Sequence, residues 1–304
     1  MANSIRKFIP KPVKKSLLTM TKVLNIAKVT LKSWRRRKVL GKYIQNYILE
    51  KFFDPNIGKE YGISKQTKTD LVKMFRLIPT KVQTATNWLY YVHMATVIFN
   101  ISKKQKGDVI ECGCWKGGSS AILSLICKEV GRKLIIADSF EGIPEDDDKH
   151  GHFYTHLSVL GYYEKGMYGG SMEEVKNNIG QYGKIKVCQF VKGFYKDSLK
   201  KFKKPLVFAF LDVDLRSSLE DSVKYIWSNL SDGSFIYTDD SCDMDVVKFW
   251  FDENWWKKNL KQKAPGYVGS GCGLPITPEY SSLGYTRKIK NAEKIFKRKN
   301  WFNG

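Results

Sequence analysis

The chain has no apolar run of about 20 residues, the length that a helix needs to cross a bilayer. Its first residues lack the uninterrupted apolar segment and the small-residue cleavage site of a secretory signal peptide. The six cysteines are scattered and form no CxxC pair, so the sequence predicts neither a disulfide framework nor a cysteine metal site. We therefore expect a cytoplasmic protein with reduced thiols.

Acidic residues are scarce, with 30 Asp and Glu against 52 Lys and Arg and a formal net charge of +22. Such an excess favours anionic partners. Residues 1–42 contain thirteen Lys or Arg and no acid, and Leu17, Leu24 and Leu31 recur every seven residues. This pattern predicts a basic amphipathic helix that can bind the inner face of an anionic membrane. Alternatively, its apolar stripe packs on the chain's own domain or on a dimer partner.

The 304 residues, with 42% hydrophobic and 13% aromatic content, predict a folded globular protein. We divide the chain into a basic N-terminal extension (1–42), a helical cap (43–104), an α/β domain (105–290) and a basic tail (291–304). Within the cap we expect three helices, at Tyr43–Phe53, Asp70–Ile78 and Ala85–Asn100.

A strand, a helix and a second strand are expected between Val207 and Asp240. Val207–Leu211 is a continuous apolar run, as in a strand buried on both faces of a parallel sheet. Ser217–Leu230 has apolar residues at helical spacing, Asp232–Gly233 predicts a turn, and Phe235–Tyr237 begins the next strand.

Both of these strands end in carboxylates, namely Asp212 and Asp214 on the first and Asp239 and Asp240 on the second. The carboxyl ends of parallel strands share one sheet edge, where open α/β sheets bind ligands. Several carboxylates there repel one another unless a cation joins them, and an all-oxygen set suits Mg²⁺. The alternative is that these aspartates cap helices or lie in loops.

A glycine-rich segment, Glu111–Ser120, lies between an expected strand at Asp108–Ile110 and an apolar helix at Ala121–Val130. Its pattern, E-x-G-x-x-x-G-G, lets a ligand approach backbone N–H groups at a helix N-terminus. Glu111 is suited to accept hydrogen bonds from a cationic amine. The alternative is a set of tight turns without a ligand.

A second acidic residue, Asp138, ends the expected strand Lys133–Ala137. A carboxylate at this point fits bidentate binding of a ribose diol, and Phe140 is placed to stack on adenine. Alternatively, Asp138 caps the following turn.

The stretch from Glu145 to Gly170 is a long polar insertion that predicts a substrate lid. It contains His150, His152 and His156, any of which could act as an acid or base, although surface histidines without a role are common.

The remaining elements complete the α/β pattern. We expect a helix at Ser171–Ile179, a strand at Ile185–Val191 and an aromatic-rich helix at Met244–Trp256. Gly266–Gly273 and Leu283–Lys288 suggest a terminal pair of antiparallel strands.

Five segments in this order resemble the macrocin O-methyltransferase family (TylF type), which belongs to the class I S-adenosylmethionine-dependent methyltransferases. The segments are Gly107–Ser120, Asp138–Pro144, Lys192–Phe194, Leu211–Ser218 and Ser231–Asp240. The resemblance implies a Rossmann-like, mostly parallel sheet of seven strands with helices on both faces, preceded by the helical cap. It also implies a homodimer and Mg²⁺-dependent transfer of a methyl group from S-adenosyl-L-methionine to a sugar hydroxyl.

The resemblance assigns roles to matching residues. Asp214 would be the general base, and the metal ligands would be Asp212, Asp239 and Asp240. The cofactor would contact residues of the glycine loop, the second strand's end and the turn after Lys192, namely Glu111, Gly113, Trp115, Gly117, Gly118, Ser119, Ser120, Asp138, Ser139, Phe140, Gly193 and Phe194.

Two other functions fit the charge. One is a non-catalytic, basic surface-binding protein with a degenerate methyltransferase fold. The other is an RNA methyltransferase, which is less favoured because the chain lacks an Asn-Pro-Pro-Tyr motif for a flipped base.

Overall fold

The computed structural model describes residues 41–145, 152–154, 159–161, 163–267 and 283–290. The chain divides into two compact units, residues 1–47 and 48–304, and the account below concerns the second. Nearly all of the basic extension (1–42) and all of the tail (291–304) lie outside the described residues, so membrane binding by the extension stays a prediction. None of the described helices combines the length and hydropathy that a bilayer crossing requires.

The core of the second unit is a sheet of six strands within the described residues, in the order β5-β2-β1-β6-β7-β8. The strands are β1 (Asp108–Cys112), β2 (Leu134–Asp138), β5 (Cys188–Lys192), β6 (Leu206–Leu211), β7 (Leu230–Thr238) and β8 (Gly284–Arg287). All neighbours are parallel except β7 and β8, which are antiparallel. This confirms the mostly parallel α/β sheet, with six described strands where the resemblance implied seven.

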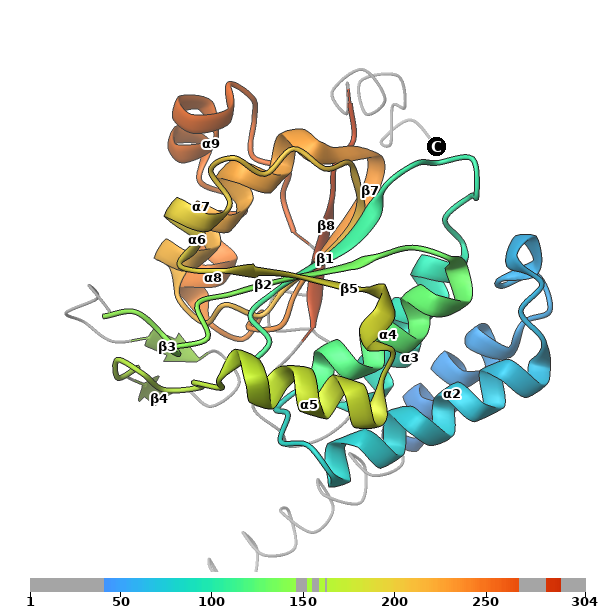
Figure 1. Cartoon of the computed structure of the whole chain (residues 1–304). Helices are drawn as coiled ribbons and strands as arrows, with labels where there is room; N and C mark the ends of the chain where they lie inside the picture. Colours follow the sequence, from blue (N-terminus) through green and yellow to red (C-terminus); the bar gives the residue numbers. More distant parts are fainter. Residues whose placement is uncertain (1–40, 146–151, 155–158, 162, 268–282, 291–304) are drawn as a thin grey trace, which may run out of the picture. The chain divides into compact units, whose positions relative to one another are not determined.

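Helices cover both faces of this sheet (Figure 1). One face carries α3 (Trp88–Phe99), α4 (Gly118–Val130) and α5 (Met172–Tyr182), with α2 (Lys65–Leu77) packed against α3 and α4. The other carries α6 (Tyr195–Ser198), α7 (Arg216–Ile226), α8 (Met244–Phe249) and α9 (Glu253–Leu260). Residues 41–53, α2 and α3 confirm the helices expected in the cap.

The core explains why these segments form strands. Every residue of β6 is buried, as its unbroken apolar run predicted. On the side of α7, α8 and α9 the sheet packs against a cluster of large aromatics that includes Trp227, Phe249, Trp250 and Trp256. Burying apolar surface of this size is the main source of stability for such a domain.

Two expected boundaries are wrong. Strand β7 already begins at Leu230, so Asp232 and Gly233 lie inside an irregular first part of the strand instead of a turn. Gly233 has a φ of 81°, which lets the backbone bend there without ending the strand. The predicted strand Ile185–Val191 starts only at Cys188, after a 3₁₀ turn at Ile185–Val187.

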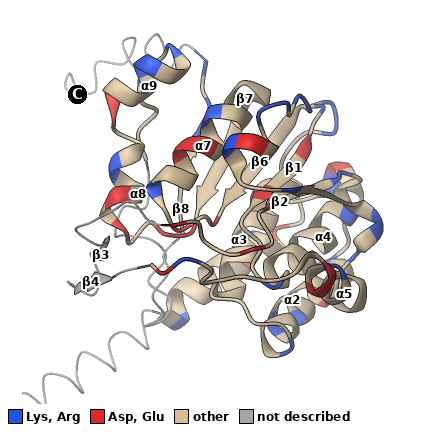
Figure 2. Cartoon of the chain, turned by 60° about the vertical axis from the view of Figure 1, so that its left-hand side comes forward, with Lys and Arg blue, Asp and Glu red and all other residues tan. Residues whose placement is uncertain are grey.

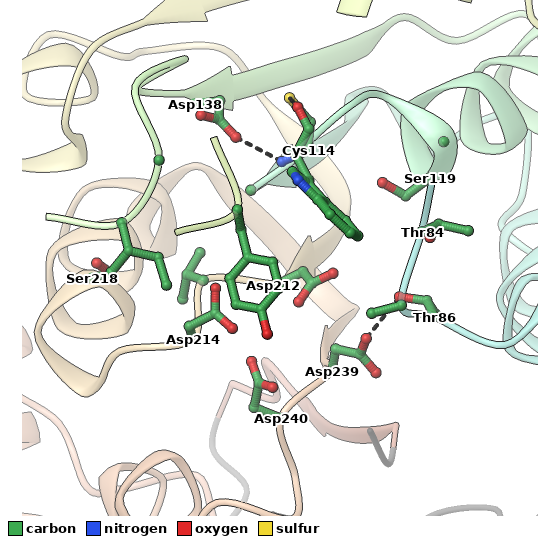
Figure 3. A pocket seen from close by; sticks show the side chains of 18 of the residues that line it. Thr84, Thr86, Cys114, Ser119, Asp138, Asp212, Asp214, Ser218, Asp239 and Asp240 are labelled. Carbon is green, nitrogen blue, oxygen red and sulfur yellow. Dashed lines mark hydrogen bonds between the residues drawn. The ribbon is translucent and has the colours of Figure 1, made fainter. Parts of the chain in front are cut away.

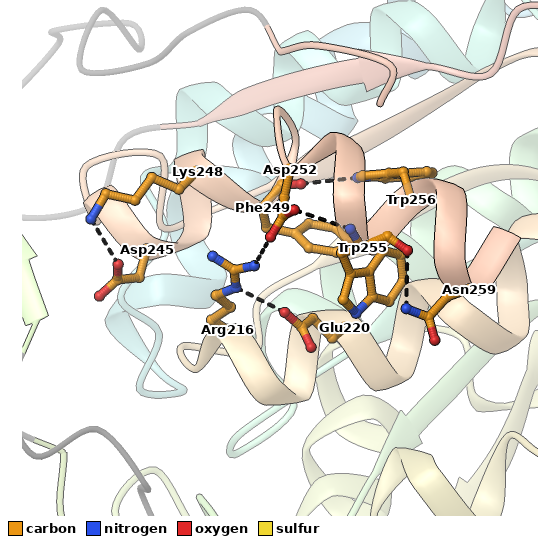
Figure 4. A network of polar contacts seen from close by, with 9 residues as sticks. All are labelled: Arg216, Glu220, Asp245, Lys248, Phe249, Asp252, Trp255, Trp256 and Asn259. Atoms are coloured by element: carbon orange, nitrogen blue, oxygen red, sulfur yellow. Dashed lines mark hydrogen bonds and ion pairs between the residues drawn. The ribbon is translucent and has the colours of Figure 1, made fainter. Parts of the chain in front are cut away.

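The single helix expected at Met244–Trp256 is two helices, because Asp252 begins a new one. Its carboxylate accepts a hydrogen bond from the backbone N–H of Trp255 at 3.0 Å, which caps α9. The same carboxylate pairs with the guanidinium of Arg216, whose Nε contacts Glu220 Oε1 at 2.8 Å (Figure 4). The break therefore ties α9 to the first turn of α7.

Two expected segments are only partly described. Leu283–Lys288 does contain a strand, β8, and its described partner is β7. Residues 268–273 of the other expected strand lie outside the described residues. In the insertion Glu145–Gly170, a short antiparallel pair forms from β3 (His152–Tyr154) and β4 (Val159–Gly161). His150 and His156 lie outside the described residues, so an acid or base role for a histidine stays a prediction.

Candidate active site

A cavity of about 770 Å³ lies at the carboxyl edge of the parallel strands. Its walls come from the loops that follow β1, β2, β5, β6 and β7, and from residues 79–88 ahead of α3. The order of strands reverses beside β1, because β2 lies on one side and β6 on the other. Ligands of open α/β sheets bind at such a switch point.

The cavity brings together most of the residues that the sequence singled out. Those lining it are Gly113, Trp115, Gly118, Ser119, Asp138, Ser139, Phe194, Asp212, Asp214, Asp239 and Asp240. Five others are not among the lining residues, namely Glu111, Gly117, Ser120, Phe140 and Gly193.

The glycine loop is in direct contact with the loop after β6. Gly113 has a φ of 85°, and a Cβ at this position would lie 1.7 Å from the backbone O of Asp212. The Asp212 N–H donates to the carbonyl of Cys112 at 2.9 Å, which holds the two loops side by side. Only glycine fits here, so the E-x-G part of the motif has a packing reason as well as a ligand-binding one.

Glu111 is more deeply buried than the sequence suggested. Its side chain is fully buried and accepts a hydrogen bond from the Ser120 hydroxyl. Burial raises the pKa of this carboxyl to about 7, and hydrogen bonds from Ser119 and Ser120 oppose the rise. The carboxyl does not line the cavity, so its predicted contact with a cationic amine has no support from its position and stays a prediction.

Asp138 lies where a ribose-binding carboxylate was expected. Its Oδ2 accepts from the Cys114 N–H (Figure 3) and its Oδ1 from the Phe140 N–H, each at 2.7 Å. Two backbone donors fix the side chain before any ligand arrives, while Oδ2 keeps a lone pair for a further donor. The capping alternative is thus confirmed, and it is compatible with ribose binding, which stays a prediction.

Phe140 does not occupy the position expected for adenine stacking. The residue is 7% exposed, is absent from the cavity wall, and has its ring centroid 6.3 Å from that of Phe190 on β5. Its φ of 59° turns the backbone so that Asp138 can bond to its N–H.

The four carboxylates after β6 and β7 face one space (Figure 3). Burial, followed by repulsion from Asp239, Asp240 and Asp214, raises the pKa of Asp212 well above its usual value. The pKa of Asp240 is also raised, first by burial and then by Asp214, although the Asp214 N–H donates to its carboxylate. Asp214 itself has a φ of 57°, an uncommon conformation for a residue with a side chain.

The chemistry of this cluster fits a hard cation, although its arrangement is not a closed ligand set. Within the part of the chain that the structure describes, no three His, Cys, Asp or Glu side chains converge closely enough to hold a metal. Oδ2 of Asp240 is nevertheless buried and accepts no hydrogen bond from the described residues. Carboxylate oxygens that are buried together favour either protons or a bound cation.

The sequence analysis missed Thr86, which lies beside the acidic cluster. Its hydroxyl donates to Asp239 Oδ2 at 2.7 Å, and the residue is 3% exposed. The two residues are 153 positions apart, and a threonine just before the N-cap of α3 has no distinctive pattern. No signal in a single sequence could have paired them.

We expect Thr86→Val to lower the free energy of unfolding by about 1–3 kcal/mol, because it leaves a buried carboxylate oxygen without its donor. Urea denaturation measures the change. Thr96→Val is the matched control, since the Thr96 hydroxyl donates only to the Val92 carbonyl within α3, at 2.9 Å. Equal losses in the two variants would contradict a specific role for the bond to Asp239.

Two tyrosines beside Trp115 form a second feature that the sequence did not reveal. Trp115, Tyr163 and Tyr168 line the cavity, and the rings of Trp115 and Tyr168 meet edge to face at 5.4 Å. Tyr168 is 40% exposed and has a φ of 53°. Its pKa is raised by burial and then by the charges of Asp214, Asp240 and Asp212, so the phenol lies near the carboxylates.

The sheet order, the glycine loop after β1 and the acid at the end of β2 define an α/β fold of the methyltransferase type. The model of the macrocin O-methyltransferase (TylF) family matches residues 87–264, and the chain belongs to this family.

Two relatives and a solved structure are similar to this chain. The 8-demethyl-8-(2,3-dimethoxy-alpha-L-rhamnosyl)-tetracenomycin-C 4'-O-methyltransferase of Streptomyces olivaceus is 32% identical, over 44% of this chain and 52% of the relative. The mycinamicin III 3''-O-methyltransferase of Micromonospora griseorubida is 29% identical, over 45% and 56%. The chain thus spans about half the length of these curated relatives. The structure of the O-methyltransferase NovP is 16% identical, covering 85% of this chain and all of that one, with a TM-score of 0.49.

Proposed function

We propose that the protein transfers a methyl group from S-adenosylmethionine to a hydroxyl of a sugar, in a glycan, a glycolipid or a glycosylated natural product. One observation carries the proposal: the glycine loop, Asp138 and four carboxylates face the same cavity. Family membership supports the reaction type, and one matched relative is named for methylation of a compound that bears a rhamnosyl group. The cavity volume of about 770 Å³ lies within the range of small-molecule sites.

The donor half of the site is built from backbone and one carboxylate. The N-terminus of α4 supplies N–H groups, and Asp138 is held rigidly enough to bind the two hydroxyls of a ribose. S-adenosylmethionine, when bound there, supplies an electrophilic methyl group on a sulfonium. The loops then contribute mainly orientation, which is a large part of catalysis for a two-substrate reaction.

The acceptor half has to provide a base. A sugar hydroxyl is a poor nucleophile at neutral pH, so a group must remove its proton as the new bond forms. Asp214 lines the cavity and its backbone N–H is bonded to the Asp240 carboxylate, which fixes the loop that carries it. We assign Asp214 the role of general base. The aromatic rings of Trp115 and Tyr168 offer apolar surface to a sugar ring beside these carboxylates.

Asp212, Asp239 and Asp240 are the residues that would hold Mg²⁺. When bound, the ion would lower the pKa of an acceptor hydroxyl and offset the repulsion among the carboxylates. The support is the all-oxygen donor set and the buried Oδ2 of Asp240. Because the side chains do not converge in the described arrangement, we expect binding of the cation to draw them together.

The proposal is tested with the full chain by calorimetric titration with S-adenosylmethionine, followed by mass spectrometry of surface polysaccharide and glycolipid. Cells without this protein should lack a methyl group on one sugar, and the purified protein should restore it. If the protein fails to bind S-adenosylmethionine, the enzyme proposal is wrong and a non-catalytic binding role is favoured.

Removal of divalent metal tests the Mg²⁺ assignment separately. Methyl transfer should fall at least tenfold in EDTA and return when Mg²⁺ is added in excess, whereas binding of S-adenosylmethionine should change little. Asp212→Ala should likewise lower methyl transfer at least tenfold and leave binding of S-adenosylmethionine nearly unchanged, but excess Mg²⁺ should not restore its activity. Full activity in EDTA would contradict the metal assignment and would leave the methyltransferase proposal unaffected.

A further inference from the structure

The edge of the sheet opposite the cavity carries a dense set of lysines. The loops that enter β1, β2, β5 and β6, at residues 100–107, 131–133, 183–187 and 199–205, contain ten exposed lysines and no acidic residue. We call these four loops the basic edge. Part of it is the blue loop beside β6 and β1 in Figure 2. On α2, by contrast, Lys73 is neutralised by Asp70 at 3.1 Å.

The four loops form one continuous surface, because their strands are neighbours and start level with one another. Asp108 pairs with Leu206, Val109 with Leu134, and Leu134 with Cys188. Hydrogen bonds connect adjacent loops, from the Lys133 ammonium to the Lys186 carbonyl at 3.2 Å and from the Asp108 N–H to the Pro205 carbonyl at 2.9 Å.

Two carboxylates contact the basic edge, and backbone donors already engage both. Asp108 Oδ1 accepts from the Lys133 N–H at 2.9 Å. Glu60 Oε2 accepts from the Lys103 N–H at 2.9 Å and from the Ser102 hydroxyl at 3.1 Å. These two carboxylates offset only part of the charge of ten lysines. The basic edge therefore has a strong net positive potential.

We propose that the basic edge docks the protein on an anionic phospholipid bilayer. Its charges are compact, flexible ammonium groups at the ends of parallel strands, which suit an array of lipid phosphates better than a single shaped ligand. Arg132, the one arginine on these loops, is 8% exposed and donates to the carbonyls of Gly107 and Ser102. The aromatic residue among them, Phe202, packs against the core. The edge thus lacks the exposed arginines and stacking rings with which proteins bind single-stranded nucleic acid.

Docking through the basic edge determines which way the opening of the cavity faces. Strands of five or six residues lie between the basic edge and the carboxylates. At 3.3 Å per residue, this length is a separation of about 16–20 Å. With the lysines against the lipid, the cavity opens away from the bilayer, so this docking favours a water-soluble acceptor over a glycolipid held in the same membrane.

The test compares two full-chain variants with the same loss of charge. One replaces Lys104, Lys106, Lys201 and Lys203 on the basic edge by Gln; the other replaces Lys81, Lys165, Lys196 and Lys248, four exposed lysines on segments next to the cavity or after β7. Sedimentation with vesicles of phosphatidylcholine and phosphatidylglycerol measures the affinity, and thermal unfolding checks that both variants fold.

The basic-edge variant should bind these vesicles roughly tenfold or more weakly, because each lysine near the surface contributes to the attraction. The cavity-side variant should bind within about threefold of the native chain, and neither protein should bind pure phosphatidylcholine. The proposal is overturned if both variants lose affinity equally or if the basic-edge variant binds undiminished. A loss of binding to single-stranded RNA with unchanged vesicle binding would overturn it as well.

Discussion

Asp214→Asn should reduce methyl transfer by about 10²–10⁴-fold, because the amide cannot take the proton from the acceptor hydroxyl. The substitution preserves the size of the side chain, and the Asp214 N–H that bonds to the Asp240 carboxylate belongs to the backbone and remains. Binding of S-adenosylmethionine should therefore be retained. The measurement is transfer of labelled methyl to the glycan fraction of cells that lack the protein, combined with calorimetry of cofactor binding.

Asp221→Asn is the matched control, since Asp221 is a half-buried carboxylate on α7 that does not line the cavity. It should retain nearly full activity. The base assignment would be wrong if Asp214→Asn kept more than about a tenth of the native rate, since a positioned base contributes at least 10²-fold.

Gly113→Ala should be the most damaging small substitution in the chain. The new Cβ would lie 1.7 Å from the backbone O of Asp212, and a φ of 85° strains any residue with a side chain. Backbone atoms cannot move aside as the end of a flexible side chain can, so we expect a loss of more than about 4 kcal/mol in unfolding free energy. Cofactor binding should be lost as well. Urea denaturation and calorimetry with S-adenosylmethionine measure the two effects.

Gly131→Ala is the control that separates the cost of a left-handed backbone conformation from the cost of the steric clash at Gly113. Gly131 has a φ of 67°, but nothing lies within 4 Å of a Cβ placed there. Its substitution should cost only the 1–2 kcal/mol or so of a left-handed conformation and leave cofactor binding unchanged. Similar losses for the two variants would mean that the contact between Gly113 and Asp212 is not what makes the loop intolerant.

The sequence predicted features that follow from local pattern and from the rules of parallel sheets. β6 is recognised by its apolar run, and the carboxylates after β6 and β7 meet because parallel strands end at one edge. Asp138 was found for the same reason. Such predictions need no knowledge of which helix packs where.

Features that depend on tertiary contact were not predictable. Glu111 and Phe140 were assigned to the ligand from their place in a motif, but whether a side chain turns toward a cavity or into the core is decided by packing. Thr86 bonds to Asp239 although 153 positions separate the two residues in the sequence. The aromatic periodicity continues past Asp252 in the sequence, so the helix break there was not predicted. The break depends on the capping bond of Asp252 and on its ion pair with Arg216.

The contact between Gly113 and Asp212 has a consequence for how this enzyme family can diversify. Since the glycine loop after β1 and the loop after β6 touch through backbone, their spacing is set by the main chain and cannot be retuned by exchanging side chains. The segments at 79–88 and 163–168 line the same cavity without carrying that constraint. We expect acceptor preference to change through these two segments, so that substrate range evolves independently of the geometry of methyl transfer.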